Sequence, residues 1–252
     1  MKRRLYRRVA AHLAAAGFDV LTWDWRGTGD SRPASLRGFD ATMTDWATGD
    51  LAGALAWASR ERGGRPIVAV GHSFGGQAMG LAPGARELAA LVTVAAQSGW
   101  YGHWPAPRRW VLAALWRVAV PSLVAALGWF PSRRFGIGEE LPAGVALEWA
   151  RWCRSPGYLG DHHGWAGHRA LGVPVLALSF DGDPIAPPRA VAALHREYAA
   201  GAPVTMRHVG AAESGRPLGH FGFFRDERAR PLWDEVAAWL RATIASGTEP
   251  RP

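Results

Sequence analysis

The stretch that decides the fold is Gly71-His72-Ser73-Phe74-Gly75-Gly76, which directly follows the apolar run Pro66-Ile67-Val68-Ala69-Val70. A short continuous apolar run of this kind predicts a buried strand. Glycines lie two residues before and two residues after Ser73, and Gly-x-Ser-x-Gly after a strand makes a sharp turn that leaves the serine side chain free. The flanking glycines relieve crowding in such a turn. Ser73 is therefore a candidate nucleophile and not only a small turn residue.

Other apolar runs predict further strands, with helical patterns between them. These runs are mostly continuous rather than alternating, as expected for strands that helices cover on both faces. The alternation predicts a three-layer α/β sandwich with a mainly parallel sheet, in a single domain of residues 1–252. The predicted strands are residues 18–24, 66–70, 88–97, 174–180 and 203–209, and the predicted helices are 5–16, 44–60, 187–199 and 227–244.

Residues 100–170 interrupt this alternation, because the gap between two predicted strands is far longer than one crossover needs. Eight of the fourteen tryptophans lie there. The segment predicts an inserted helical cap or lid. Its tryptophans could pack it onto the rest of the fold, could line a pocket for an apolar or aromatic acyl substrate, or could do both on two faces. Its most apolar part, residues 110–130, is long enough to cross a membrane. Arg117 and Pro121 near its centre instead favour a buried or cap helix and no stable membrane span.

The composition narrows the functional classes. Cys153 is the only cysteine, so no intrachain disulfide can form, and we expect a reducing, cytoplasmic location. The net charge is +8, yet Lys2 is the only lysine and the arginines are spread along the chain. Because basic and aromatic residues do not gather into a binding module, we expect no nucleic-acid partner.

A serine nucleophile needs a base, and the base needs an orienting acid. On a parallel sheet such groups follow the carboxyl ends of strands. Residues 88–138 contain no Asp or Glu, so the acid must come later. Asp183 directly follows the run 174–180 and is the first candidate, with Asp181 as the alternative. His220, in the predicted loop before the terminal helix, is the candidate base.

The other histidines favour structural roles. Asp161, His162, His163 and His168 carry metal-ligand chemistry, but adjacent histidines usually point apart, and we expect no metal and no organic cofactor. His72 is too close to Ser73 along the chain to align as its base, so it is expected to pack or to line the pocket.

Together these motifs resemble the α/β-hydrolase fold superfamily, and most closely an uncharacterised bacterial group of predicted serine hydrolases. Residues 24–31, DWRGTGDS, are similar to its D-x-R-G-x-G-x-S loop, and the resemblance runs from about Leu5 to Ile244. It implies a triad of Ser73, Asp183 and His220, with the backbone N–H of Phe74 as one oxyanion donor. It further implies a serine esterase (EC 3.1) that cleaves a small-molecule carboxylic ester or thioester.

The sequence departs from the family at its beginning. Family members have three strands before the D-x-R-G loop, and only about seventeen residues precede residue 18 here. Residues 18–24 could pair directly with 66–70, another chain could fill the gap, or the true start could lie upstream of Met1, which we expect. The amino-terminally truncated fold would lack half of the oxyanion hole. The alternatives are therefore other triad chemistry (acyl transfer, peptidase, carbon–carbon hydrolysis) or a catalytically impaired fragment or binding protein.

Overall fold

The computed structural model describes residues 1–136 and 138–247. Its centre is a four-stranded sheet in the order β1-β2-β5-β6, and every neighbouring pair in it is parallel. The strands are β1 (Ile67–His72), β2 (Leu88–Val94), β5 (Val175–Phe180) and β6 (Val204–Val209). All four were predicted from their apolar runs, and the mainly parallel α/β sheet is confirmed.

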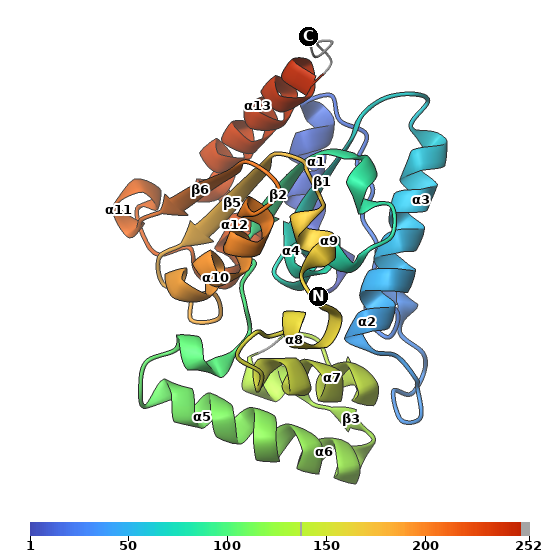
Figure 1. The fold of residues 1–252 in the computed structure, drawn as a ribbon, viewed down its shortest axis with the longest axis vertical. Helices are drawn as coiled ribbons and strands as arrows, with labels where there is room; N and C mark the ends of the chain where they lie inside the picture. The colour runs from blue at the N-terminus through green and yellow to red at the C-terminus, as the bar shows by residue number, and fades with distance from the viewer. Residues whose placement is uncertain (137, 248–252) are drawn as a thin grey trace.

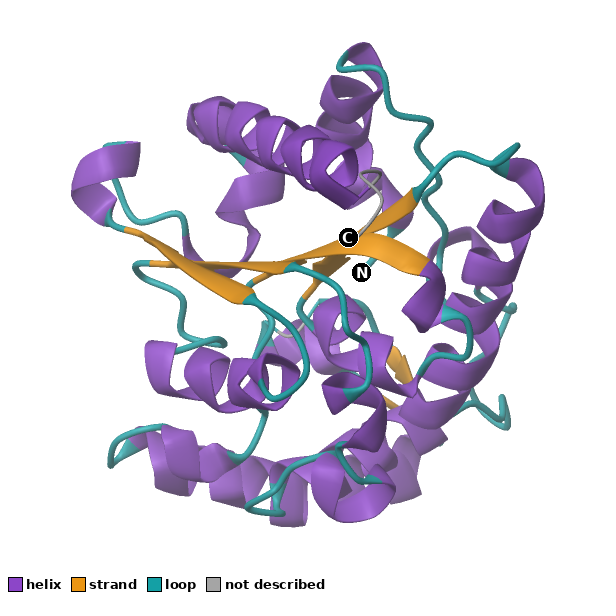
Figure 2. Cartoon of the chain, turned by 45° about the horizontal axis from the view of Figure 1, so that its top comes forward, coloured by secondary structure: helices purple, strands orange, loops and turns teal. Residues whose placement is uncertain are grey.

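Helices cover both faces of this sheet, which makes three layers (Figure 2). On one face, side chains of the sheet pack against Leu13, Phe223 and Trp233, which come from the first helix and the last two. On the other face, a second cluster packs Leu51 and Leu194 against the sheet. The helices are α1 (Arg7–Ala15), α2 (Met43–Asp45), α3 (Ala52–Glu61), α4 (Phe74–Ala78), α5 (Arg108–Ala114), α6 (Val120–Leu127), α7 (Ala143–Cys153), α8 (Gly160–His163), α9 (Ala166–Arg169), α10 (Pro188–Ala199), α11 (Ala211–Ser214), α12 (Gly219–Arg225) and α13 (Arg230–Gly247).

The prediction of a strand at residues 18–24 is wrong. These residues follow α1 as an irregular segment, and among the described residues β1 pairs with β2 alone. A cavity of about 640 Å³ separates the two segments and is lined by Leu21 and Trp23 on one side and Val68 on the other. Direct pairing of 18–24 with β1 therefore does not occur. An apolar segment becomes a strand only where a neighbour pairs its backbone groups.

The residues between β2 and β5 form a separate group of helices at the lower end of the molecule (Figure 1). A third apolar cluster holds it together and includes Trp116, Val145 and Trp152. A short antiparallel pair, β3 (Trp129–Phe130) with β4 (Leu141–Pro142), closes the turn between α6 and α7. Helices α5 and α6 join through the π-helical stretch η7 (Leu115–Ala119) into one rod. This rod is mostly exposed, contrary to a buried core helix.

Candidate active site

Ser73 lies at the turn between β1 and α4, at the carboxyl end of the sheet. Its N–H donates to the carbonyl of Val94 at 2.9 Å, which fixes the turn to the end of β2. Its backbone has φ 49° and ψ −115°, a conformation that a non-glycine residue adopts only when its surroundings impose it. The surrounding structure therefore holds Ser73 in a strained conformation at the apex of the turn, which is the position of the serine in a nucleophile elbow.

The glycines around Ser73 have different roles from those expected. A Cβ on Gly71 would lie 2.7 Å from backbone atoms of Gly75 and Gly76, so β1 and α4 meet too closely for a side chain. A Cβ on Gly76 would lie 2.6 Å from the Cβ of Ala96. A Cβ on Gly75 would have no atom within 4 Å apart from its chain neighbours and the backbone of its own helix. The close approach therefore requires Gly71 and Gly76, whereas the sequence pattern pointed to Gly71 and Gly75.

This difference gives a matched test. Gly71→Ala and Gly76→Ala are each expected to lower the free energy of unfolding by about 2 kcal/mol, because the added methyl group overlaps fixed atoms. Gly75→Ala is expected to be neutral or slightly stabilising, since alanine is the better helix former. Urea unfolding of the three variants measures the effect. Equal losses at all three positions would contradict the packing described here.

His220 and Asp183 form a buried hydrogen-bonded pair. The Nδ1 of His220 donates to Oδ2 of Asp183 at 2.8 Å, and the two side chains are only 5% and 1% exposed. The other oxygen, Oδ1, accepts the backbone N–H groups of Ile185 and Ala186 at 2.7 and 2.8 Å. These bonds fix the carboxylate in the loop after β5. With Nδ1–H bound to Asp183, Nε2 is the nitrogen left to accept a proton.

Asp181, the alternative acid, points elsewhere. Its Oδ1 accepts from Nε2 of His208 at 3.0 Å, and its Oδ2 accepts from the N–H of Ala211 at 2.8 Å. These bonds hold the pKa of Asp181 below its usual range, the Ala211 N–H first and His208 second. The structure therefore brings Asp183, and not Asp181, to His220.

His220 lies next to the nucleophile turn. The sequence predicted that His220 lies in a loop, but it is the second residue of α12. Its ring centroid is 5.0 Å from that of His72, the residue before Ser73. Within the described chain, the Oγ of Ser73 makes no hydrogen bond. Such a bond is often long or misaligned without substrate, so the geometry leaves Ser73 and His220 available as nucleophile and base.

His72 has a supporting contact that the sequence did not reveal. Its Nε2 donates to the backbone carbonyl of His220 at 3.0 Å, and its Nδ1 accepts from the hydroxyl of Tyr6 at 3.2 Å. Burial, and then the neighbouring His220, keeps the pKa of His72 well below its usual range. A neutral imidazole with both nitrogens bonded positions the backbone of His220. Only the three-dimensional contact shows this role.

Three tryptophans surround Phe74, the residue after the candidate nucleophile. Phe74 lies 5.7 Å from Trp25, 6.0 Å from Trp46 and 6.4 Å from Trp152, measured between ring centroids. We call these four residues the aromatic wall. Phe74 also opens α4, and the first N–H groups of a helix have no partner within it. Its N–H is therefore left to donate to a group outside the helix.

The helical segment also contacts the acid loop. The indole N–H of Trp104 donates to the carbonyl of Pro184, the residue after Asp183, at 2.9 Å. Trp104 is itself buried. Part of the insertion therefore supports the loop that carries the candidate acid.

The four residues with metal-ligand chemistry have separate partners. His162 is bonded to Ser155, His163 to Thr44, and Asp161 accepts the N–H of Gly157. His168 donates to the carbonyl of Gln77 at 2.8 Å. Among residues 1–136 and 138–247, no group of three potential ligands is placed to hold a metal ion.

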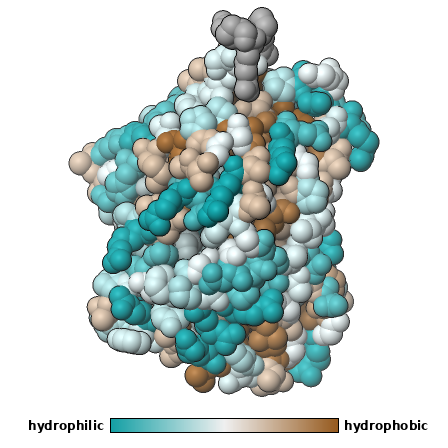
Figure 3. Space-filling view, viewed as in Figure 1, coloured by the Kyte–Doolittle hydropathy of each residue, from teal (hydrophilic) through white to brown (hydrophobic). Residues whose placement is uncertain are grey.

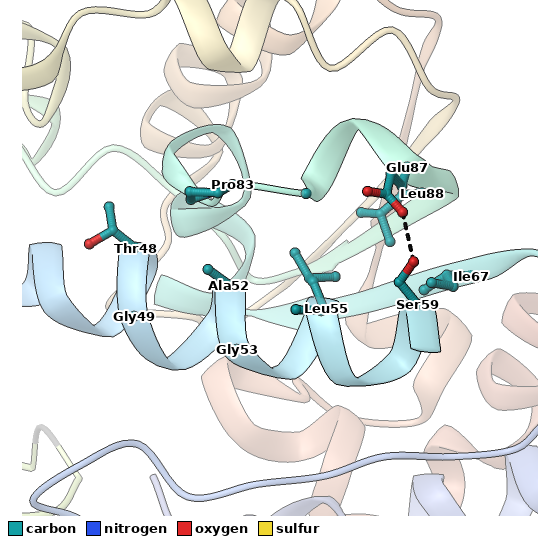
Figure 4. A pocket seen from close by; sticks show the side chains of 12 residues that line it. Thr48, Gly49, Ala52, Gly53, Leu55, Ser59, Ile67, Pro83, Glu87 and Leu88 are labelled. Atoms are coloured by element: carbon teal, nitrogen blue, oxygen red, sulfur yellow. Dashed lines mark hydrogen bonds between the residues drawn. The ribbon is translucent and has the colours of Figure 1, made fainter. Parts of the chain in front are cut away.

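Two cavities lie near the sheet but do not include Ser73. One, of about 370 Å³, lies between α3 and the loops before β2, where Ser59 donates to Glu87 at 2.9 Å (Figure 4). Its other lining residues do not titrate, so it offers little acid–base chemistry. The other is the cavity beside β1, which reaches Gly71 and His72. Neither cavity is lined by Ser73, Asp183 or His220.

We compared the sequence and the fold with those of known proteins. A family model described as the alpha/beta hydrolase family matches residues 3–245. No curated protein sequence matches the chain. The fold is similar to a thermophilic esterase from Thermogutta terrifontis (22% identity, TM-score 0.58, 97% of this chain and 87% of that chain covered). It is also similar to a monoacylglycerol lipase from Paleococcus ferrophilus (17%, 0.59, 96% and 90%) and an esterase from Exiguobacterium antarcticum (17%, 0.61, 95% and 88%). Because the family model spans nearly the whole chain, the protein belongs to the alpha/beta hydrolase family.

Proposed function

We propose that the protein is a serine hydrolase that cleaves a carboxylic ester or thioester. The observation that carries this proposal is the buried bond between His220 and Asp183 beside the turn of Ser73. His220 Nε2 takes the proton of Ser73 Oγ as the oxygen attacks the acyl carbon, and then gives it to the leaving alcohol or thiol. Water, deprotonated by the same nitrogen, then attacks the acyl-enzyme, and His220 returns the proton to Ser73 Oγ as the bond to the acyl carbon breaks and the acid leaves. Asp183 keeps the imidazole in the tautomer that both steps need.

The tetrahedral oxyanion needs hydrogen-bond donors. We propose the N–H of Phe74 as one of them, because it opens α4 directly after the nucleophile. A missing donor costs about 10²- to 10³-fold in rate. Membership of the family supports a hydrolase. Because only one oxyanion donor is assigned, we expect its turnover rate to depend on whether a second N–H group also reaches the oxyanion.

The substrate we propose carries an apolar or aromatic acyl group. Phe74 and Trp25 are the two half-buried members of the aromatic wall and offer apolar surface next to the nucleophile, while Trp46 and Trp152 are buried behind them. Two of the similar structures are described as esterases and one as a monoacylglycerol lipase. The only cysteine, Cys153, is buried and free, which suits a reducing compartment and the cytoplasmic location we propose.

A fluorophosphonate probe tests the proposal, because it phosphonylates only an activated serine. We expect stoichiometric labelling of the wild type, and loss of both labelling and hydrolysis of p-nitrophenyl esters in Ser73→Ala. Ser98→Ala is the matched control, since Ser98 is buried and bonded to Nε2 of His103 at 3.1 Å, yet is not in the proposed triad. Unlabelled folded wild type, or labelling that persists in Ser73→Ala, would overturn the assignment.

A further inference from the structure

The rod formed by α5, η7 and α6 has an unusual outer surface. The helix Arg108–Leu127 is the one helix in the described chain that is long and apolar enough to cross a membrane, yet only 22% of its most apolar window is buried. Trp110, Val111 and Val118 are 63%, 66% and 62% exposed. A soluble helix normally turns its charged side chains to water. The exposed apolar side chains here therefore call for an explanation.

The two faces of the rod are distinct. Its inner face packs Ala113, Trp116, Val120 and Val124 against the rest of the helical segment. The exposed positions recur at helical spacing on the other side. They are Arg108, Trp110, Val111, Ala114, Arg117, Val118, Ser122, Ala125 and Ala126. Six of these nine side chains are apolar and the charged ones are all arginines, so the outward face has no acidic group.

The charged residues on the rod and directly after it have one sign. Arg108, Arg109 and Arg117 lie on the rod, and exposed Arg133 and Arg134 follow it; among the described residues none of the five forms an ion pair. The nearest acids along the chain, Glu139 and Glu140, are paired with Lys2 and Arg32. In the space-filling view, apolar atoms reach the surface at the lower end of the molecule, near the rod (Figure 3).

We propose that this face docks on the surface of a membrane that contains anionic phospholipid. Exposed apolar side chains enter the boundary between headgroups and acyl chains, while the arginines, which have no acidic partner in the described chain, bind lipid phosphates. The helix lies in the plane of the interface rather than crossing the bilayer, because Trp116 and Val120 on its inner face are buried in the protein core. The chemistry of one face thus matches both parts of an anionic lipid surface. The inference is independent of whether Ser73 reacts.

Sedimentation with vesicles tests the proposal. We expect the protein to bind vesicles of phosphatidylglycerol and phosphatidylcholine, to bind much less to phosphatidylcholine alone, and to be released by 0.5 M salt. Trp110→Glu with Val118→Glu should lower the partition coefficient at least about tenfold. Arg108→Gln with Arg117→Gln should lower it about twenty-fivefold at low salt, at about fivefold for each arginine.

The matched control is Trp57→Glu with Met206→Glu. It introduces the same charges at side chains that are 46% and 48% exposed on α3 and β6, away from the rod. This variant should bind vesicles more strongly than the rod variant by about tenfold, and circular dichroism should show that both are folded. Three results would overturn the proposal: no binding to anionic vesicles, equal loss in rod and control variants, or a solution dimer that the rod substitutions disrupt in place of vesicle binding.

Discussion

Replacing Asp183 by asparagine is expected to lower kcat for ester hydrolysis by about 10⁴-fold, while Asp181→Asn is expected to change it less than about twofold. The two residues are separated by one position in the same loop, and both are carboxylates at the end of β5. They differ in what they bind. Asp183 accepts the Nδ1–H of buried His220, whereas Asp181 accepts from His208 on β6.

The large effect follows from the tautomer of His220 in the proposed triad. An asparagine at 183 can keep the bonds from the N–H groups of Ile185 and Ala186 through its carbonyl oxygen. Its amide nitrogen then faces Nδ1 of His220 and donates to it, so the imidazole proton moves to Nε2. A protonated Nε2 cannot accept the proton of Ser73, and general-base catalysis is lost.

Steady-state kinetics with a p-nitrophenyl ester measures both variants, and urea unfolding shows whether either loses stability. Asp181→Asn is the control for any charge effect of the loop. Similar losses in the two variants, or a larger loss in Asp181→Asn, would show that Asp183 is not the orienting acid.

Local patterns predicted most of the sheet. The runs that became β1, β2 and β5 are largely apolar on both faces, as expected for strands that helices cover on both sides. The run that became β6 lies at the edge of the sheet and carries exposed Thr205, Met206 and His208. Residues 18–24 show the limit of this argument. Their apolar sequence is also typical of a strand, but strand formation depends on a partner, and the sequence of one segment does not contain its partner.

The candidate site shows the same division. The order of Ser73, Asp183 and His220 along the chain follows from which strand each residue succeeds, and so it could be predicted. The sequence also favours Asp183 over Asp181, and the structure adds its bond to His220. The requirement for Gly76 rather than Gly75, and the bond from His72 to the backbone of His220, could not be predicted. Each depends on distances between segments that are far apart in sequence.

Mild acid is expected to destabilise the folded protein through buried neutral histidines. His168 and His195 are 0% and 2% exposed, and burial lowers the pKa of each to about 4. The imidazoles in the unfolded chain bind protons near pH 6.5. Their contribution to stability is therefore complete above pH 6.5 and is lost as the pH falls towards 4. Between pH 7 and pH 5 we expect each histidine to remove about 2 kcal/mol from the free energy of unfolding.

Hydrogen bonding explains why these side chains stay neutral. The Nδ1 of His195 donates to the carbonyl of Val191 at 2.8 Å, and its Nε2 lies 2.7 Å from the hydroxyl of Thr93, which donates to it. His168 donates through Nε2, and its buried Nδ1 has no partner in the described part of the chain. A second proton on either ring would be a buried charge with no carboxylate bonded to it.

Urea unfolding at pH 7, 6 and 5 measures the slope of stability against pH. His195→Gln and His168→Gln are each expected to reduce the loss between pH 7 and pH 5 by about 2 kcal/mol, whatever their stability at pH 7. Tyr198→Phe is the matched control: it removes the buried bond from this hydroxyl to the carbonyl of Gly76 without removing a histidine, so it should lower stability equally at each pH. An unchanged slope in both histidine variants would mean that other groups cause the acid sensitivity, because the folded protein would then bind protons at these two rings as readily as the unfolded chain.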